Sequence, residues 1–459
     1  MCGITALISN NDNIIFDLYE SLYHLQHRGQ DGFGISYINN HNLDVIKFKG
    51  LLSTIDINDK LTNIKSNIGI GHVRYPTIGN NTVNECQPFI KQGLYHNLSL
   101  VHNGQIWITD KLTNYFKTNK IDISTDITSD SIYLLSYLSY KFNLHETLDD
   151  KKIQIIISEL YDLFEGSYNC ICIIQNYGLI CFKDPHSIRP LVLGCKKDNY
   201  IISSESVSIT SIDYKIISDI YNNELYVFKD ELYDKYSIKE KSNILKPCIF
   251  EWVYLAREES IMYNVNVYQS RLKMGEYLAN KICKSIDIND IDLVVPVPDT
   301  SKPVALQISK MINKPYYEAI TKNRYINRTF IMDSQNKRKK NIKRKLNVIK
   351  GLVYHKNVMI VDDSIVRGNT IKHIIELLKN NEVNKIYIIS SSPEIINENK
   401  YGIDIPNKED LISYNHPNIK EYLQVEDIIF QDLDDLKKSI QFFNPNITDF
   451  ELSIYNMTQ

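Results

Sequence analysis

The chain has 459 residues, which is long enough for two or three domains that each bury a hydrophobic core. Charged residues make up 23% of it and the formal net charge is −3, so the composition gives no bias toward nucleic acid or membrane surfaces. Its apolar stretches are far too short to cross a bilayer, and its eight cysteines follow no metal-ligand spacing. We therefore expect a cytoplasmic protein with reduced cysteines that binds neither membranes nor nucleic acid.

Cysteine is the second residue, directly after the initiator methionine. Removal of Met1 would leave Cys2 with a free α-amine beside its own thiol. An α-amine titrates near ~7.7–8.0 and a free thiol near ~8.5, so one residue can supply both a nucleophile and a base. Taken alone the signal is weak, because a cysteine can also stand at this position by chance.

Up to about residue 235 the sequence reads as short strands with a few helices. Gly3–Ser9 and Gly34–Ile38 are typical of strands, and Asp17–His27 places leucines on one helical face before Gly29 stops the helix. Further apolar strands lie between Asn169 and Phe182. This part predicts an α+β sandwich.

Beyond a linker near residues 235–250 the pattern changes to alternating strands and helices. The expected elements are strands at Leu293–Val297, Val358–Val361 and Lys385–Ser390, and helices at Lys302–Ile312 and Thr370–Asn380. Continuous apolar strands that alternate with helices predict an α/β domain with a mainly parallel sheet. Such sheets bind ligands beyond the carboxyl ends of their strands. The expected domains are residues 2–235 and 236–459.

The strongest local signal is the stretch Val358–Thr370, where a hydrophobic strand ends in two carboxylates and a glycine-containing loop opens a helix. Adjacent carboxylates can accept hydrogen bonds from ribose hydroxyls, and backbone N–H groups at a helix N-terminus can bind a phosphate. The stretch resembles the phosphoribosyl diphosphate motif of type I phosphoribosyltransferases, with Asn369 in place of the usual threonine. The resemblance assigns substrate binding to Asp362, Asp363, Ser364, Val366, Arg367, Gly368, Asn369 and Thr370.

Two further segments resemble parts of the same family. Val297–Lys302 resembles the diphosphate-binding loop, which implies contacts from Asp299, Thr300 and Ser301. Lys322–Ile331 looks like the mobile flap that closes over the substrate, where Lys322, Arg324, Tyr325 and Arg328 could neutralise the departing diphosphate. Asn327, Asp333 and Ser334 depart from the family pattern of the flap. The resemblance also implies Mg²⁺ near Ser301, Asp362 and Asp363, held mainly by the substrate.

Three short motifs follow Cys2 in a fixed order, namely Gly71–Thr77, His102–Gly104 and Thr128–Asp130. Together they resemble the αββα glutaminase domain of the N-terminal-nucleophile amidotransferases. The resemblance makes Cys2 the nucleophile, Asn103 and Gly104 the groups that stabilise the oxyanion, and Arg74 and Asp130 the partners of the glutamine carboxylate and ammonium groups. His24–Asp31 matches the same domain. Arg28 is thereby assigned to the glutamine site, and both histidines of this stretch receive structural roles because the α-amine can serve as the base.

The combined pattern resembles one family, the glutamine phosphoribosyl diphosphate amidotransferases (amidophosphoribosyltransferases). The resemblance runs from Cys2 to about Leu436 and includes Tyr401–Asp404, whereas the tail after Lys437 no longer resembles the family clearly. It implies synthesis of 5-phosphoribosylamine, the first committed step of purine synthesis, with release of glutamate and diphosphate and internal transfer of ammonia. It also implies inhibition by purine nucleotides and a dimer or tetramer.

Some relatives bind an iron–sulfur cluster through four cysteines and carry a cleaved propeptide. Here Cys248 stands at a plausible ligand position, but Lys400 occupies another. The chain therefore resembles the branch without a cluster or propeptide. Two alternatives stay open at this stage: a glutaminase coupled to another acceptor, and a non-catalytic sensor of phosphoribosyl diphosphate or nucleotides.

Overall fold

The chain folds into two compact units. The computed structural model describes residues 2–9, 13–54, 61–75, 82–124, 126–229, 232–238, 244–323, 346–405 and 407–455. The first unit comprises Met1–Cys248 together with Lys400–Asp404, and the second comprises Ile249–Asn399 and Ile405–Gln459. This division differs from the expected boundary between residues 235 and 236, because the last strand of the first unit continues to Ser237. Of the described helices, not one combines the length and the apolar character needed to cross a membrane.

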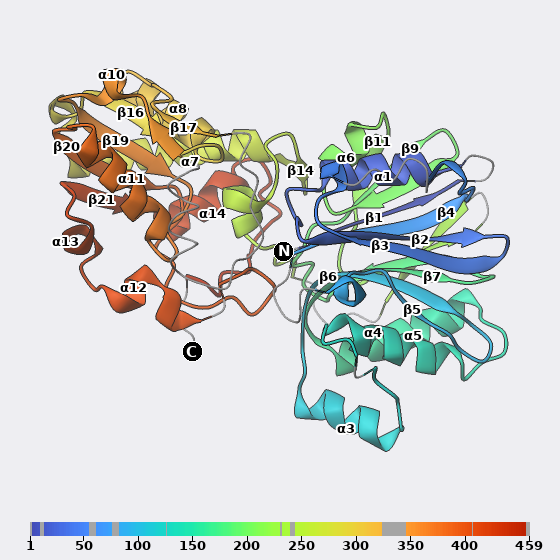
Figure 1. Cartoon of the computed structure of the whole chain (residues 1–459). Helices are drawn as coiled ribbons and strands as arrows, with labels where there is room; N and C mark the ends of the chain where they lie inside the picture. Colours follow the sequence, from blue (N-terminus) through green and yellow to red (C-terminus); the bar gives the residue numbers. More distant parts are fainter. Residues whose placement is uncertain are drawn as a thin grey trace. The chain divides into compact units, whose positions relative to one another are not determined.

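The first unit is a four-layer sandwich of helices, two sheets and helices (Figure 1). The seven-stranded sheet has the order β11-β9-β10-β1-β4-β2-β3 and the six-stranded sheet the order β13-β12-β8-β7-β6-β5. The strands of the first sheet are β1 Gly3–Ile8, β2 Gly32–Asn39, β3 Asn42–Lys49, β4 Ile68–Arg74, β9 Val192–Lys196, β10 Asn199–Ser203 and β11 Lys215–Asp219. Those of the second are β5 Phe89–Lys91, β6 Leu98–Trp107, β7 Glu165–Ile174, β8 Gly178–Lys183, β12 Glu224–Lys229 and β13 Leu232–Ser237.

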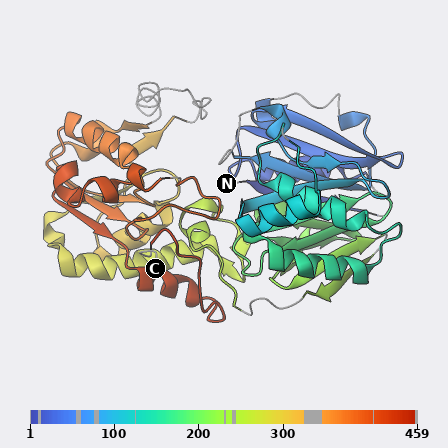
Figure 2. The same ribbon diagram turned by 90° about the horizontal axis from the view of Figure 1, so that it is seen from below.

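Helices cover the outer faces of both sheets. The helices α1 (Ile15–His24) and α6 (Val207–Thr210) lie on the first sheet, and α4 (Ser131–Phe142) and α5 (Asp150–Leu163) lie across the second, as the view from below also shows (Figure 2). The helix α3 (Asp110–Thr118) follows β6.

Period-two alternation along β7 explains the layers. Cys170 and Cys172 belong to the core under α4 and α5, whereas Ile171 and Ile173 belong to the core between the two sheets. Successive side chains of a strand point to opposite faces, so this strand is buried on both. Cys170 and Cys172 therefore share one face of the strand.

Two glycines of β4 let α1 approach the first sheet closely. A Cβ atom on Gly69 would lie 2.8 Å from a methyl group of Leu18, and one on Gly71 would lie 2.6 Å from Leu22. Since neighbouring residues of a strand alternate between faces, His72 and Arg74 point away from α1, toward the interior between the sheets. The packing of the helix thereby decides which β4 side chains face the pocket described below.

The second unit is built on a four-stranded parallel sheet with the order β16-β19-β20-β21. These strands are β16 Leu293–Pro296, β19 Asn357–Asp362, β20 Lys385–Ser390 and β21 Asp427–Phe430. The helices of eight or more residues are α7 Val267–Ser285, α8 Lys302–Ile312, α11 Asn369–Asn380 and α14 Leu433–Gln441, and the shorter ones are α10 Lys350–Val353, α12 Ile412–Asn415 and α13 Ile419–Leu423. Two antiparallel pairs also belong to this unit: β14 Ile261–Met262 with β15 Val265–Asn266, and β17 Ile320–Lys322 with β18 Leu346–Val348. The expected fold class is confirmed in both units.

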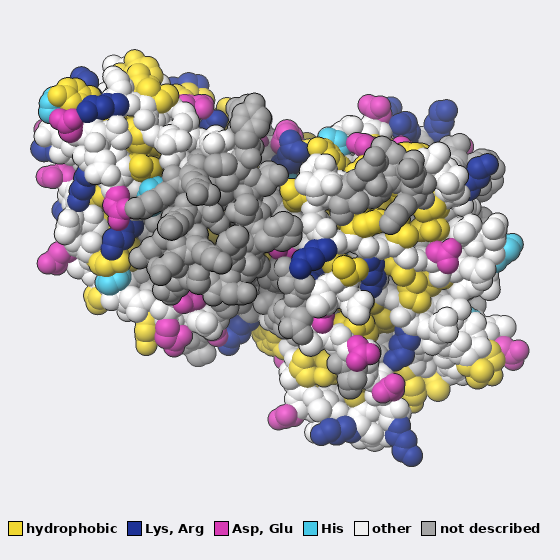
Figure 3. Space-filling view, viewed as in Figure 1, with side chains coloured by type: hydrophobic (Ala, Val, Ile, Leu, Met, Phe, Trp, Pro, Cys, Tyr) yellow, Lys and Arg dark blue, Asp and Glu magenta, His cyan; other side chains and the backbone are white. Residues whose placement is uncertain are grey.

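Surface charge on the two units follows the composition. On the face shown in Figure 3, the basic and acidic side chains of the described residues are interspersed rather than gathered by sign. This agrees with the small formal net charge of −3.

Candidate active sites

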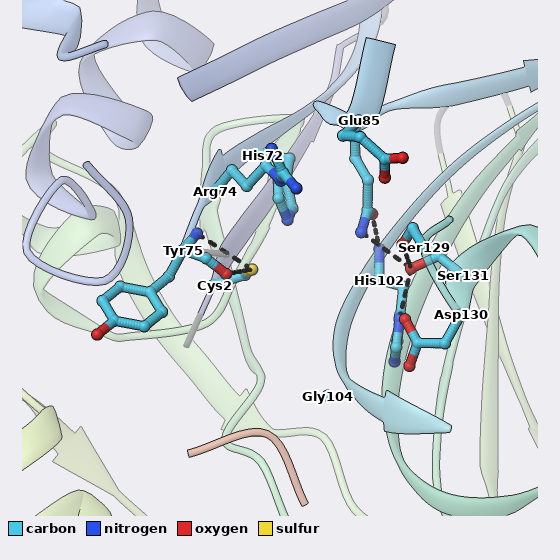
Figure 4. Close-up of a pocket in the computed structure, with 11 residues that line it drawn as sticks. Cys2, His72, Arg74, Tyr75, Glu85, His102, Gly104, Ser129, Asp130 and Ser131 are labelled. Carbon is cyan, nitrogen blue, oxygen red and sulfur yellow. Dashed lines mark hydrogen bonds between the residues drawn. The ribbon is translucent and has the colours of Figure 1, made fainter. Parts of the chain in front are cut away.

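Residues from several elements of the first unit line one pocket. Its lining residues are Cys2, His72, Arg74, Tyr75, Glu85, Gln87, His102, Gly104, Ser129, Asp130 and Ser131. In Figure 4, Cys2, Arg74 and Tyr75 lie on one side of the pocket, and His102, Ser129, Asp130 and Ser131 lie on the other. Four of the residues assigned to glutamine chemistry, Cys2, Arg74, Gly104 and Asp130, are therefore brought together.

The thiol of Cys2 lies against the backbone of Tyr75. Its Sγ atom is 3.5 Å from the Tyr75 nitrogen, which donates to it, and 3.6 Å from the Tyr75 carbonyl oxygen. Cys2 directly precedes β1, which pairs with β4, so the register of these two strands sets this contact. The phenol of Tyr75 donates in turn to Oδ2 of Asp404, over 3.0 Å.

Arg74 ends β4 and is buried, as is Arg28. A Cβ on Gly29 would lie 2.5 Å from the Val73 carbonyl carbon, so glycine is required where this turn meets β4. That close approach, rather than the end of the helix, explains Gly29, because α1 already ends at His24. Arg28 bonds through Nε to buried Glu205, which also accepts from His27 Nε2 over 2.7 Å.

Arg28 is not one of the residues that line the pocket. Its side chain packs against the start of β1 instead, since a Cβ on Gly3 would lie 3.2 Å from its Cδ. Arg28 therefore contacts the start of β1, the strand that directly follows Cys2, from outside the pocket.

The strand β6 supplies the two groups assigned to the oxyanion. Gly104 has φ +152°, and a Cβ there would lie 2.0 Å from the Ser167 carbonyl oxygen, so only glycine fits. The side chain of Asn103 is fully buried, and neither its amide nitrogen nor its amide oxygen has a hydrogen-bond partner. A buried amide without partners is costly, which is the state expected of a donor that waits for a ligand.

Asp130 stands directly before α4 and is anchored by the backbone. Its Oδ2 accepts from the N–H of Ile106 on β6 over 2.6 Å. The turn before it is anchored by Glu85, whose Oε1 accepts from the N–H of Thr128 over 2.7 Å and from its hydroxyl over 2.8 Å. These bonds hold the motif at 128–130 against the pocket.

Two histidines line the pocket, and both are neutral. Burial lowers the pKa of His72 well below its ordinary value, and the nearby Arg74 lowers it further. Burial also lowers the pKa of His102, whose Nδ1 lies 2.8 Å from the Ser131 hydroxyl. Each ring is therefore uncharged at neutral pH.

Three lining residues lie outside the motifs that the sequence indicates. Ser131 directly follows the motif at 128–130, whereas Glu85 and Gln87 stand apart from every motif. The Gln87 amide accepts from the N–H of His102 over 2.6 Å and donates to the Ser131 hydroxyl over 3.0 Å. Glu85 and Gln87 both act through tertiary contacts with segments far along the chain. No local pattern around positions 85–87 signals such a role.

In the second unit, β19 ends in the two adjacent carboxylates. Burial raises the pKa of Asp362 well above its ordinary value, and neighbouring Asp363 raises it further. Burial likewise raises the pKa of Asp363 to about 6, although the hydrogen bond from Ser364, the charge of Arg271 and the nearby Thr300 side chain oppose this. Two adjacent carboxylates whose ionisation burial disfavours form a site that favours a bound cation.

The loop after these carboxylates leads into α11. Gly368 precedes the helix with φ +74°, a backbone conformation that favours glycine, and a Cβ there would lie 2.5 Å from Cδ1 of Ile412. The helix begins at Asn369, so its first backbone N–H groups face the loop. Arg367 lies in the loop, 3.5 Å from Asp410.

The loop that follows β16 reaches the same edge of the sheet. The strands β16 and β19 are parallel neighbours, and the Thr300 side chain lies near Asp363, where it helps to lower the pKa of that carboxyl. The Ser301 hydroxyl donates to the Val297 carbonyl over 2.6 Å, and Asp299 lies 3.1 Å from the Lys322 ammonium. The expected loops thus meet as predicted. The flap residues Arg324, Tyr325 and Arg328, like Asn327, Asp333 and Ser334, lie outside the described residues.

Each arrangement suits a distinct chemistry. The first pocket combines the Cys2 thiol, the Arg74 guanidinium, the Asp130 carboxylate and the backbone at Gly104. This set suits nucleophilic attack on the side-chain amide of an amino acid. The second site offers carboxylates and free backbone donors, which suit a phosphorylated sugar.

Comparison with protein families identifies both halves of the chain. Residues 1–163 match the family of class-II glutamine amidotransferases, and residues 266–393 match the phosphoribosyl transferase domain.

Several known proteins are similar over nearly the whole chain. The chain is 40% identical over 468 residues to the amidophosphoribosyltransferase of Pasteurella multocida (strain Pm70), covering 99% of this chain and 92% of that protein. It is 37% identical over 470 residues to the amidophosphoribosyltransferase of Escherichia coli (strain K12), with the same shares covered. A solved structure of the glutamine phosphoribosylpyrophosphate amidotransferase from B. subtilis, complexed with ADP and GMP, superposes with a TM-score of 0.84 at 28% identity. That match covers 96% of this chain and 92% of the other.

Proposed function

The chain belongs to the amidophosphoribosyltransferase family, and from this premise we propose which of its residues perform each step. The enzyme transfers the amide nitrogen of glutamine to phosphoribosyl diphosphate, the first step of purine synthesis. The observation that carries the assignment is the convergence of Cys2, Arg74, Gly104 and Asp130 on one pocket.

The glutaminase steps begin after excision of Met1. The Cys2 thiolate attacks the side-chain amide carbon of glutamine, and the free α-amine accepts and returns the proton. The Gly104 N–H and the unpartnered Asn103 amide stabilise the oxyanion. Arg74 binds the α-carboxylate and Asp130 the α-ammonium. Ammonia leaves, and water releases glutamate from the thioester. Arg28 supports this site from behind through its bond to Glu205.

The transfer step takes place at the edge of the parallel sheet. Asp362 and Asp363 accept hydrogen bonds from the ribose hydroxyls, and the loop 364–370 with the first turn of α11 binds the 5-phosphate. Asp299, Thr300 and Ser301 face the diphosphate. Ammonia attacks C1 of the ribose and diphosphate leaves, while Lys322 and the flap residues Arg324, Tyr325 and Arg328 offset its charge.

Mg²⁺ fits the donors at this edge. The carboxylates of Asp362 and Asp363 both have a raised pKa, and carboxylate and hydroxyl oxygens are the ligands Mg²⁺ prefers. Ser301 supplies a nearby hydroxyl. When bound together with the substrate, the ion neutralises charge on the leaving diphosphate.

Binding of magnesium phosphoribosyl diphosphate should weaken in acid. The pKa of Asp363 is raised to about 6, so this carboxylate gains its proton as the pH falls through that value and then no longer attracts the ion. We expect the dissociation constant, measured by calorimetry, to rise as the pH falls from about 7 to 5. An affinity that stays constant from pH 7.5 to 5 would contradict the role given to this pair.

The products of turnover test the proposed function as a whole. Purified enzyme should release glutamate and diphosphate in equal amounts, and only when glutamine and phosphoribosyl diphosphate are both present at saturation. Glutamate release stimulated by another sugar phosphate instead would favour a different acceptor. Absence of any turnover would favour a sensor.

Regulation, assembly and location are further parts of the proposal. The B. subtilis structure is complexed with ADP and GMP, which supports purine nucleotides as inhibitors here. We also propose a dimer or tetramer, a cytoplasmic location and no iron–sulfur cluster. The absence of a cluster is motivated by Lys400, which occupies one of the ligand positions in the cluster-containing relatives.

A further inference from the structure

Five residues from the C-terminal half of the chain fold as part of the first unit. These are Lys400–Asp404, whose neighbours Asn399 and Ile405 belong to the second unit. The N–H of Asn399 donates to the Ile405 carbonyl over 3.0 Å and closes the base of this short loop. The first unit is therefore completed by a segment that stands more than 150 residues beyond its other part.

Backbone carbonyls of this segment are bound by side chains of the second sheet. The indole Nε1 of Trp107, at the end of β6, donates to the Lys400 carbonyl over 2.7 Å, and its ring lies 5.3 Å from the ring of Tyr401. The Tyr401 carbonyl accepts from the Ser167 hydroxyl over 2.9 Å and also from the fully buried Arg189. Three side chains thus fix two successive peptide groups.

These contacts surround the Gly104–Gln105 peptide group. Ser167, which donates to Tyr401, also accepts from the N–H of Gln105 over 3.1 Å. Gly402 has φ +94°, and a Cβ there would lie 3.1 Å from the Gly104 carbonyl oxygen and 3.2 Å from its carbonyl carbon. Gly104 is therefore held by β7 on one side and by residues 401–402 on the other.

We propose that Tyr401 and Gly402 are positioning residues of the glutamine site, which fix Gly104 where its N–H meets the oxyanion. Preorganised donors stabilise a transition state only while their geometry is held, and a misplacement of about 1 Å can cost 10²-fold in rate. The inference rests on the role of Gly104 proposed above. It means that glutaminase chemistry requires the segment 400–404 as well as the N-terminal residues.

Gly402→Ala tests this directly. The added methyl group meets the Gly104 carbonyl, and alanine is strained at the positive φ, so the Gly104 peptide must shift. We expect kcat for glutamine to fall roughly 10- to 100-fold while KM for glutamine changes less than about threefold, because the oxyanion donor acts in the transition state. Synthesis from ammonia should keep its full rate.

Gly351→Ala is the matched control, because a Cβ on Gly351 meets nothing within 4 Å. It should retain both activities. Wild-type glutamine kinetics in Gly402→Ala would overturn the proposal. So would an equal loss of glutamine- and ammonia-dependent rates in that variant, since this is the pattern of general destabilisation.

Trp107 gives a second, independent variant. Trp107→Phe removes the hydrogen bond to Lys400 but retains an aromatic ring beside Tyr401, whereas Trp107→Ala removes both contacts. We expect a small kcat loss for phenylalanine and a larger one for alanine. In the double variant Trp107→Ala with Gly402→Ala, the fold loss of kcat should be smaller than the product of the two single losses, because both substitutions act on the Gly104–Gln105 peptide group. Independent, multiplicative effects would contradict a shared route through Gly104.

Failure of this inference can be distinguished from failure of the proposed function. If the wild-type enzyme uses glutamine and Cys2→Ala does not, the proposed function stands whatever Gly402→Ala does. If the wild-type enzyme releases no glutamate from glutamine, the proposed function itself is wrong, and the inference about Tyr401 and Gly402 is wrong with it.

Discussion

Replacing Cys2 by alanine is expected to lower synthesis of phosphoribosylamine from glutamine by at least about 10³-fold, since covalent catalysis loses its nucleophile. Synthesis from ammonia at high pH should continue, because the phosphoribosyl site lies in the other unit and needs no thiol. Diphosphate release with each nitrogen donor measures both reactions in one assay.

Cys283→Ala provides the matched control, because Cys283 is exposed and lies on α7 of the second unit. It should retain both activities. Appreciable glutamine use by Cys2→Ala would show that another group is the nucleophile. Loss of the ammonia reaction in the same variant would show that the two chemistries are not separable as proposed.

Replacing Asp363 by asparagine is expected to lower both the glutamine- and the ammonia-dependent rates by at least about 10²-fold, because a charged partner of the ribose and of Mg²⁺ is lost. In the absence of substrate and metal, the same variant should be more stable than the wild type at pH 7.5. Burial raises the pKa of Asp363 to about 6, so the Asp363 carboxyl binds its proton more tightly in the folded state than in the unfolded state. Ionisation of this carboxyl at pH 7.5 therefore lowers the stability of the wild type.

The sign of the stability effect follows from proton linkage. The unfolded chain binds fewer protons than the folded one between about pH 4 and 6, so the contribution of Asp363 to stability falls as the pH rises through this range. Asparagine removes that cost, and we expect a Tm a few degrees above wild type at pH 7.5, with little difference at pH 4. Asp434→Asn, at an exposed carboxylate on α14, is the control. Normal turnover in Asp363→Asn would contradict the assignment.

The sequence predicted most of the fold because its signals are local. Leu293–Val297, Val358–Val361 and Lys385–Ser390 are continuous apolar runs, and each became a parallel strand within one residue of its expected bounds at either end. The helix Lys302–Ile312 begins and ends as expected. The first helix was less well placed, because it starts at Ile15 and Gly29 serves packing rather than termination.

Parts of the site depend on contacts that no local pattern records. Glu85 and Gln87 reach the pocket through hydrogen bonds to Thr128, His102 and Ser131. The division of the chain into two units depends on tertiary contacts too, namely the pairing of β13 with β12 and the return of residues 400–404 to the first unit. The other candidate residues came from motif resemblance, and in the first unit Cys2, Arg74, Gly104 and Asp130 line one pocket.

The mass of the N-terminal peptide from the fully active enzyme shows whether the mature chain begins with the nucleophile Cys2. After reaction with an electrophilic glutamine analogue, we expect a peptide that lacks Met1 and carries one equivalent of the analogue on Cys2, in proportion to the glutamine-dependent activity lost. A peptide that retains Met1 in fully active enzyme, or an analogue bound to another residue, would contradict this role of Cys2.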